Sequence, residues 1–153
     1  MAIRQKNVIQ GKMRGRVVSP ERTTVSVRDL QVDLDEPTER GGTNTGLTPT
    51  ETAISALIGC TNVVGHRCAK LHGVEVQAME IDVVYDLDRT GVMLQAEVRV
   101  PFKRIELRVR LTTTADEDAV GRMRSDLSKF CAISVLFRAA GTEIVETWDI
   151  VRP

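Results

Sequence analysis

Three cysteines, Cys60, Cys68 and Cys131, are the residues of this chain best suited to chemistry. Only the thiolate form of cysteine is a good nucleophile, so a reactive cysteine must lie where its pKa can fall. Free cysteine is also one of the most often buried residue types, and there it behaves as a small hydrophobic side chain. For each of the three, a reactive thiol and a packing residue are therefore the alternatives to weigh.

The neighbours of each cysteine differ. Cys60 lies in the middle of a predicted helix, between Gly59 and the polar pair Thr61–Asn62. Cys131 lies next to a predicted helix start, where free backbone N–H groups favour an anion. Cys68 has the spacing of the apolar face of its helix, which favours packing. No C-x-x-C motif occurs, so the sequence does not indicate a thioredoxin-type pair.

A metal site is the other chemistry that these residue types offer. His66, Cys68 and His72 are close in sequence, but only Cys68 and His72, four positions apart, share a helix face. Two ligands are too few for a structural zinc site. We therefore expect both histidines to lie at the surface near the helix end, and we expect no metal site.

Composition narrows the class of protein. The 153 residues contain 21 Lys+Arg and 21 Asp+Glu, a balance that offers no electrostatic attraction for nucleic acid or an anionic membrane. The N-terminus lacks the apolar segment of a secretory signal, and no apolar run is long enough to span a membrane. These features predict a single cytoplasmic domain over residues 1–153, in a compartment where structural disulfides are rare.

The first half of the chain predicts strands, a loop and one long helix. Segments 7–18 and 23–34 are predicted to be β-rich, and the alternation slips near Asp29, which fits a turn or bulge. Segment 37–49 is predicted to be a loop. Thr48 and Glu51 have the spacing of a capping box, so a helix is expected from about residue 50 to 71, closed by Gly73. Its many small residues predict a buried central helix with close packing on both sides.

The second half is predicted to contain more strands than helices. Period-two alternation predicts strands over 74–85, 92–100 and 105–111. A helix is then expected to begin near Asp116, followed by a short helix over 132–140 and a last strand over 143–151. Strands and helices that are segregated in this way are typical of an α+β fold.

Two stretches of the sequence resemble the OsmC/Ohr family. The first is Asp35-Glu-Pro37, then Gly41-Gly-Thr-Asn-Thr-Gly46-Leu-Thr-Pro49, a glutamate, and a run of small residues that ends in Gly59-Cys60. The second is a cysteine at the start of a late helix, here Phe130-Cys131-Ala-Ile-Ser. The order of predicted elements also matches, and the resemblance covers most of the chain. Pro-x-Glu in place of Pro-Glu resembles the broader OsmC-like branch.

The resemblance implies a fold and an activity. The fold would have antiparallel sheets around the central helix, in an intertwined homodimer with active sites at the interface. The activity would be thiol-dependent reduction of organic hydroperoxides, and less efficiently of hydrogen peroxide. Cys60 would attack the peroxide and become a sulfenic acid, Cys131 would form a disulfide with it, and a thiol or dithiol reductant would reset the pair.

The charged residues that the family uses are harder to place on this chain. Glu51 lies nine residues before Cys60, so on a straight helix the two point in opposite directions, about 13 Å apart along the axis. Glu51 therefore has two candidate roles, catalysis and helix capping. Arg14 and Arg16 are the candidates for the arginine that stabilises the thiolate, with Arg40 as a third; a surface role is the alternative for each.

Two other functions compete with the peroxidase. One is an OsmC-like thiol sensor, or a binder of small electrophiles, without significant peroxidase activity, which the shifted glutamate and the unassigned arginine favour. The other is a structural or interaction module whose cysteines only pack.

Overall fold

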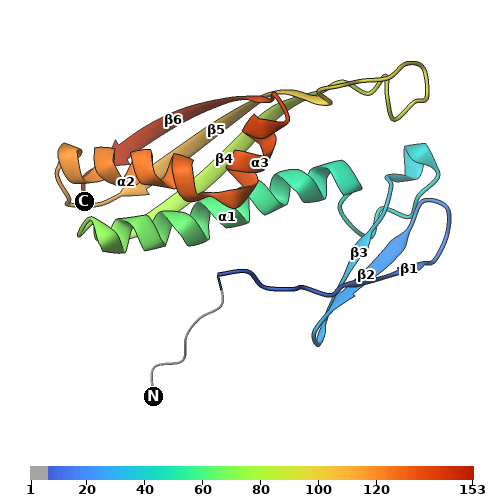
Figure 1. The fold of residues 1–153 in the computed structure, drawn as a ribbon, viewed down its shortest axis with the longest axis horizontal. Helices are drawn as coiled ribbons and strands as arrows, with labels where there is room; N and C mark the ends of the chain where they lie inside the picture. The colour runs from blue at the N-terminus through green and yellow to red at the C-terminus, as the bar shows by residue number, and fades with distance from the viewer. Residues whose placement is uncertain (1–6) are drawn as a thin grey trace. The chain divides into compact units, whose positions relative to one another are not determined.

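The computed structural model describes residues 7–153 of the chain (Figure 1). The chain forms two compact units, residues 1–53 and residues 54–153, and each is described by itself. One domain over residues 1–153 stays a prediction. None of the helices within residues 7–153 is long and apolar enough to cross a membrane.

The first unit contains a three-stranded antiparallel sheet in the order β1-β2-β3. The strands are β1 (Arg14–Val17), β2 (Thr23–Val27) and β3 (Leu30–Leu34). The slip expected near Asp29 is a tight turn, in which Arg28 takes a φ of 54°, so the segment predicted as 23–34 folds back on itself as two strands. A short 3₁₀-helix, η1 (Thr38–Arg40), follows.

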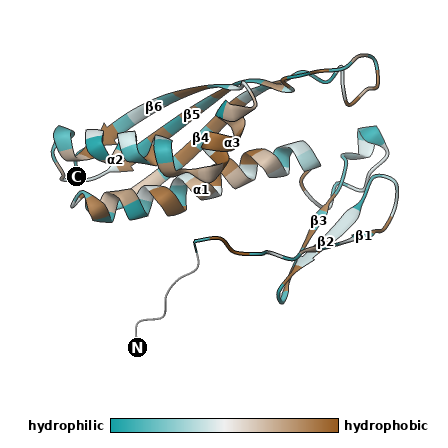
Figure 2. Cartoon of the chain, viewed as in Figure 1, coloured by the Kyte–Doolittle hydropathy of each residue, from teal (hydrophilic) through white to brown (hydrophobic). Residues whose placement is uncertain are grey.

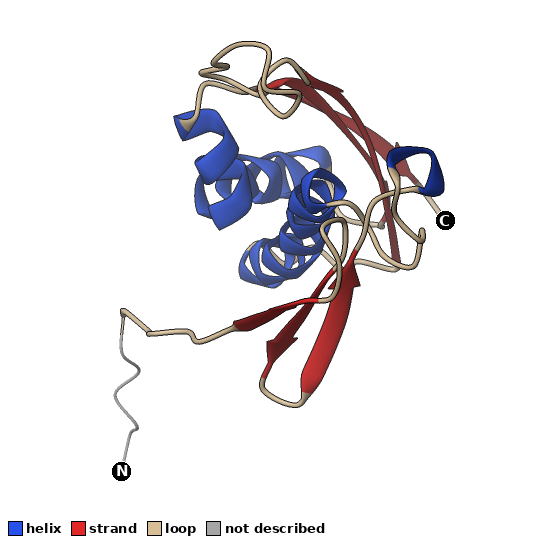
Figure 3. Ribbon diagram, turned by 90° about the vertical axis from the view of Figure 1, so that its right-hand side faces the viewer, coloured by secondary structure: helices blue, strands red, loops and turns tan. Residues whose placement is uncertain are grey.

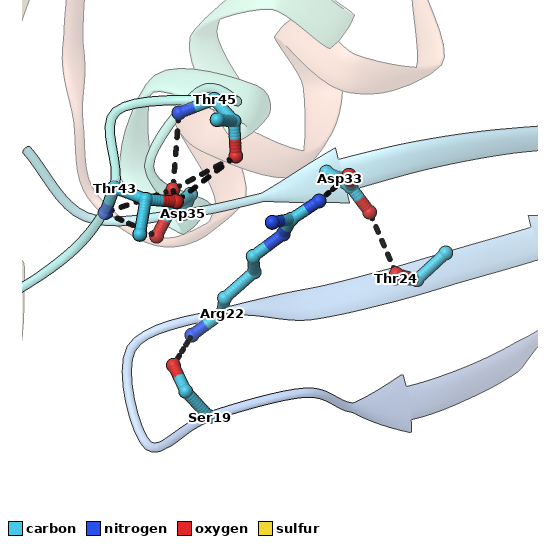
Figure 4. Close-up of polar contacts among 7 residues, drawn as sticks. All are labelled: Ser19, Arg22, Thr24, Asp33, Asp35, Thr43 and Thr45. Carbon is cyan, nitrogen blue, oxygen red and sulfur yellow. Dashed lines mark hydrogen bonds and ion pairs between the residues drawn. The ribbon is translucent and has the colours of Figure 1, made fainter.

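The loop between η1 and the long helix is fixed by a single carboxylate. Asp35, which has no exposed surface, accepts hydrogen bonds from the backbone N–H and the hydroxyl of both Thr43 and Thr45, at 2.6–3.1 Å for the shorter contacts (Figure 4). The hydroxyl of Thr43, the strongest influence, and the other donors hold the pKa of Asp35 far below its usual range. An ionised Asp35 therefore holds the glycine-rich loop in one conformation.

Helix α1 (Pro49–Leu71) begins and ends as the sequence predicts. The Thr48 N–H donates to the Glu51 carboxylate at 2.9 Å and the Glu51 N–H donates to the Thr48 hydroxyl at 3.2 Å, which completes the capping box. Gly73 follows the helix with a φ of +68°, the left-handed conformation that glycine favours. In the single chain α1 is buried along one stripe rather than on both sides: Ile54, Leu57, Thr61, Gly65, Cys68 and Ala69.

The second unit packs helices on one face of a sheet (Figure 3). The sheet has the order β4-β5-β6, from β4 (Ala78–Leu87), β5 (Phe102–Thr112) and β6 (Glu143–Val151). Helices α2 (Glu117–Phe130) and α3 (Ala132–Ala139) connect β5 to β6. The side chains of alternate β5 residues form the centre of the core together with residues of α1 and α2: Ile105, Leu107, Val109, Leu111, Leu57, Val120, Met123 and Leu127.

The helices and the sheet differ in where they carry hydrophilic residues. The carboxylate of Asp116 accepts from the Ala119 N–H at 2.7 Å and caps α2, as expected for a helix that begins there. Figure 2 shows α2 as mainly hydrophilic, whereas α1 and α3 carry more hydrophobic surface. On β5, residues 104, 106, 108 and 110 are charged and form ion pairs on the face away from the core.

Two expectations about the sheets are wrong. Residues 92–100 form turns and loop instead of a strand, because β4 pairs directly with β5 from Ala78↔Thr112 to Leu87↔Phe102 and leaves 88–101 as their connection. Leu94 takes a φ of +57°, which breaks the extended path. The second sheet is also not purely antiparallel, because β6 returns through two helices and pairs parallel with β5.

Candidate active site

Cys60 and Cys131 come together in the second unit. Cys60 lies in α1 and is partly exposed. Cys131 lies between α2 and α3 and is 1% exposed. The two side chains are direct neighbours, since Cys60 acts on the titration of Cys131 both as a hydrogen-bond partner and through its charge. All three cysteines are free thiols in this structure.

The surroundings of Cys131 keep its thiol protonated. Burial, and after it the hydrogen bond to Cys60, raise the pKa of Cys131 to about 11. The backbone N–H groups of Ser134 and Ile133, in the first turn of α3, act in the opposite direction without outweighing burial. At neutral pH, Cys131 is therefore a neutral thiol beside a more accessible one.

Cys131 occupies the break between two helices. Its backbone is extended, with φ −69° and ψ 103°, so it ends α2 and begins α3. The expectation that Cys131 opens or interrupts a helix is thus met. Arg138, in the last turn of α3, was not singled out from the sequence, although its position seven residues after Cys131 places it two helical turns along on the same short helix.

Cys68 has a different environment. It is buried, as its spacing predicts, and burial, followed by the charge of Asp126, raises the pKa of its thiol. Nearby, the ring Nε2 of His72 contacts Asp126 Oδ2 at 2.8 Å, so His72 is partly buried rather than a free surface residue. His66 is exposed. No group of three or more potential metal-binding side chains occurs within residues 7–153.

The charged candidates all lie in the first unit. Glu51 is engaged in the capping box of α1, and the helix is continuous from Pro49 to Leu71. Arg14 and Arg16 are exposed in β1. Thr24 and Arg22, with a smaller contribution from Arg16, lower the pKa of Asp33.

Arg14 and Arg16 therefore differ in their surroundings. The charge of Arg16 acts on Asp33 within the first unit, and no comparable effect links Arg14 to that carboxylate. Arg40, the third candidate, forms an ion pair with Glu36 at 3.1 Å.

An apolar hollow lies beside Cys68, between the second half of α1 and the end of α2. It has a volume of about 260 Å³ and is lined by Val64, Arg67, Cys68, Leu71 and Phe130. Val64 follows Cys60 by one helical turn, and Phe130 directly precedes Cys131. The hollow therefore contains one near neighbour in sequence of each of these two cysteines.

Comparison with known proteins decides the family. A family model described as OsmC-like protein matches residues 42–146, a range that includes both Cys60 and Cys131. The chain belongs to the OsmC-like family. No curated protein matches the chain. The family match begins after Arg14 and Arg16, so it does not extend to these two candidates.

Solved structures show the same OsmC-like fold. The OsmC-like protein from Mycoplasma pneumoniae superimposes with a TM-score of 0.75 at 12% identity, over 94% of this chain and 97% of that one. An organic hydroperoxide resistance protein OsmC from Legionella pneumophila gives 0.69 at 15% identity, over 94% and 99%. The organic hydroperoxide resistance protein OhrB of Bacillus subtilis gives 0.56 at 17% identity, over 94% and 98%. At these identities the likeness concerns the fold alone.

Proposed function

We propose that this OsmC-like protein reduces organic hydroperoxides, with Cys60 as the attacking thiol and Cys131 as the resolving thiol. The observation that carries the proposal is the asymmetry of the pair: a partly exposed thiol on α1 lies against a buried thiol whose pKa is raised to about 11. A peroxide from solvent reaches the first thiol, and the second is already in place to react with the product.

The reaction balances with these two thiols. The Cys60 thiolate attacks one oxygen of the O–O bond, the alcohol leaves after taking up a proton, and Cys60 becomes a sulfenic acid. The sulfur of Cys131 then attacks the Cys60 sulfur, its proton leaves with the hydroxyl group as water, and the disulfide forms. An external thiol or dithiol supplies the two electrons that restore both thiols. No metal or bound cofactor takes part.

An organic peroxide fits the surroundings better than hydrogen peroxide. The apolar hollow lined by Val64 and Phe130 offers a surface on which an alkyl group could be buried, and hydrogen peroxide has no alkyl group to bury there. Fold neighbours named as organic hydroperoxide resistance proteins support the same substrate class.

The remaining parts of the proposal concern charge, assembly and location. We assign the stabilisation of the Cys60 thiolate to Arg16 or Arg14, with Glu51 as the carboxylate that orients the arginine. As the family resemblance implies, we place the site at the interface of a homodimer. Turnover needs thiols to be reduced again, so we place the protein in the cytoplasm.

The test is peroxide consumption by the purified protein with a dithiol reductant. We expect tert-butyl hydroperoxide to be consumed faster than hydrogen peroxide, and we expect activity to vanish in Cys60→Ser. Cys131→Ser should still react once and then stop as the sulfenic or sulfinic acid. Cys68→Ser is the comparison variant: Cys68 lines the apolar hollow but is not one of the two reacting thiols, so turnover should persist. Turnover that persists in Cys60→Ser would overturn the proposal.

One observation favours a second candidate, a thiol sensor without significant peroxidase activity. The Glu51 carboxylate already accepts the Thr48 N–H at 2.9 Å, so its orienting role competes with capping. A single round of oxidation to the Cys60–Cys131 disulfide, without sustained turnover under saturating reductant, would establish the sensor instead.

A further inference from the structure

Arg138 joins the elements on both sides of Cys131. Its Nη1 donates to the backbone oxygen of Ser128, three residues before Cys131, at 3.2 Å, and to the hydroxyl of Ser134, three residues after it, at 2.5 Å. Its Nη2 donates to Glu146 Oε1 on β6 at 2.7 Å. One guanidinium therefore contacts the end of α2, the start of α3 and the sheet.

The position of these contacts separates them from an ordinary surface ion pair. The side chain of Glu146 is 17% exposed and Ser134 is buried, so the bonds form in partly dehydrated surroundings. Ser128 is in the last turn of α2, where backbone oxygens lack partners within the helix. Arginine satisfies several acceptors at once with its planar set of donors, which lysine cannot reproduce.

We infer that Arg138 is a positioning residue for the resolving thiol, which it holds against Cys60 by closing the break between α2 and α3. The inference rests on the proposed function. A disulfide forms only when the two Cα atoms lie within a narrow range of separation and the Cβ atoms face one another. Contacts three residues to either side of Cys131 restrict how far its sulfur can drift from that geometry.

Loss of Arg138 should therefore slow the closure of the disulfide and leave the attack of Cys60 on the peroxide unchanged. Attack of Cys60 on the peroxide does not involve Cys131, whereas closure of the disulfide does. While closure is delayed, the Cys60 sulfenic acid remains exposed to a second peroxide molecule, which oxidises it to sulfinic acid and is itself reduced to the alcohol. The ratio of disulfide to sulfinic acid thus reports the position of Cys131.

The variants are Arg138→Met, Arg138→Lys and Glu146→Gln. The control is Arg104→Met, which removes an arginine of similar exposure that bridges Glu106 and Glu143 on the outer face of the sheet. Each protein receives one pulse of tert-butyl hydroperoxide over a range of concentrations, and intact mass gives the fractions of disulfide and sulfinic acid.

For Arg138→Met we expect half-conversion to sulfinic acid at a peroxide concentration about tenfold lower than in the wild type, the ratio that a charge-assisted hydrogen bond of ordinary strength supports. The half-conversion concentration of Arg138→Lys should lie between those of Arg138→Met and the wild type. That of Arg104→Met should equal the wild-type value. The rate of sulfenic acid formation, measured with Cys131→Ser in every background, should not change. If Arg138→Met does not fold, as judged by circular dichroism, Arg138→Lys and Glu146→Gln carry the test.

A second assay separates this inference from the proposed function. Cys60 attacks oxidised glutathione, releases one glutathione thiolate and carries the other as a mixed disulfide; Cys131 then displaces that glutathione. If peroxide leaves the wild type unchanged but Arg138→Met slows this displacement, the proposed function fails and the positioning role stands. If Arg138→Met and Arg138→Lys close as fast as the wild type in both assays, the positioning role is overturned.

Discussion

The three thiols of the chain lie in unlike surroundings, although the sequence offers all of them as cysteines of helices. Cys68 belongs to the core face of α1, Cys60 reaches the surface and Cys131 is enclosed at a helix junction. Burial is the largest cause of the raised pKa for both enclosed thiols. Their second influences differ, since the charge of Asp126 acts on Cys68 and the Cys60 thiol acts on Cys131.

The raised pKa of Cys131 predicts a strong pH dependence of its alkylation. With a pKa of about 11, roughly one Cys131 in a thousand is ionised at pH 8, and the fraction rises about tenfold with each pH unit until pH 11. Iodoacetamide labelling of the reduced protein, followed by peptide mass mapping, should show Cys131 labelled last at pH 8. In denaturant it should react as an ordinary thiol. Equal labelling of Cys60 and Cys131 in the folded protein at pH 8 would contradict the assignment.

The same shift predicts the sign of a stability change. Between about pH 9 and pH 11 the folded protein retains the Cys131 proton that the unfolded chain has lost, so the free energy of unfolding falls as the pH rises through this range.

At the residue scale, the sequence predicted contacts that are local and missed those that are not. The capping box of Thr48 and Glu51 spans three residues, so its residue types alone indicate the hydrogen bonds that form. The bond from Arg138 to Glu146 depends on how α3 packs on β6, and nothing in the spacing reveals it. Likewise, Cys60 and Cys131 are 71 positions apart in sequence, and they become neighbours only through the packing of their helices.

Among the elements, the glycine-rich loop shows a structural need for glycine. A Cβ atom at Gly42 would overlap the backbone oxygen of Glu36, and one at Gly46 would overlap the backbone oxygen of Asp33. The glycines of this stretch are therefore required by close approach of the chain to itself, in the loop that Asp35 holds. The family-like spacing of the stretch has a packing reason that is independent of any ligand.

Alanine substitutions should distinguish a glycine that close backbone contact requires from a glycine that alanine can replace. We expect Gly42→Ala to lower the free energy of unfolding by about 2 kcal/mol or more, because the backbone of the loop must shift. Gly121→Ala is the matched control: Gly121 lies inside α2 with nothing within 4 Å of a Cβ, so alanine should stabilise by about 1 kcal/mol. Urea unfolding followed by circular dichroism measures both, and a neutral Gly42→Ala would show that the loop adjusts freely.

The elements that the sequence predicted well are those with two agreeing signals. Helices α1 and α2 combine apolar spacing with caps, and β5 and β6 combine alternation with clear ends. Residues 92–100 also had alternation, between a turn signal at 88–91 and Pro101, and yet form no strand, because β4 pairs directly with β5. Parallel pairing of β6 was also beyond the sequence, because pairing direction depends on how the α2–α3 connection returns.

At the scale of the whole molecule, apolar surface gathers on the helices of the second unit. Leu71 of α1, Phe130 of α2 and Leu136 of α3 are each more than 60% exposed in the single chain. Exposed apolar area of this kind on a monomer usually marks an interaction surface. The proposed homodimer would cover it.

Light scattering after size exclusion should therefore give twice the chain mass of 16.9 kDa at micromolar concentration. Leu71→Glu should shift the protein toward the monomer, because a charge would then have to be buried at the interface. Leu94→Glu is the control, since Leu94 is also exposed but lies in the β4–β5 connection and not in a helix. A wild-type protein that elutes as a monomer would remove the basis for a shared site.

The parallel pairing of β5 with β6 also bears on how the protein is made. Arg104 and Glu143, 39 positions apart in sequence, become neighbours, and contacts of such separation close late because ordering the chain between them costs entropy. Glu146 belongs to this same strand and anchors Arg138. On the ribosome, Arg138 therefore lacks its acceptor Glu146 until β6 has emerged, so the junction that holds Cys131 settles only after the last strand has been made.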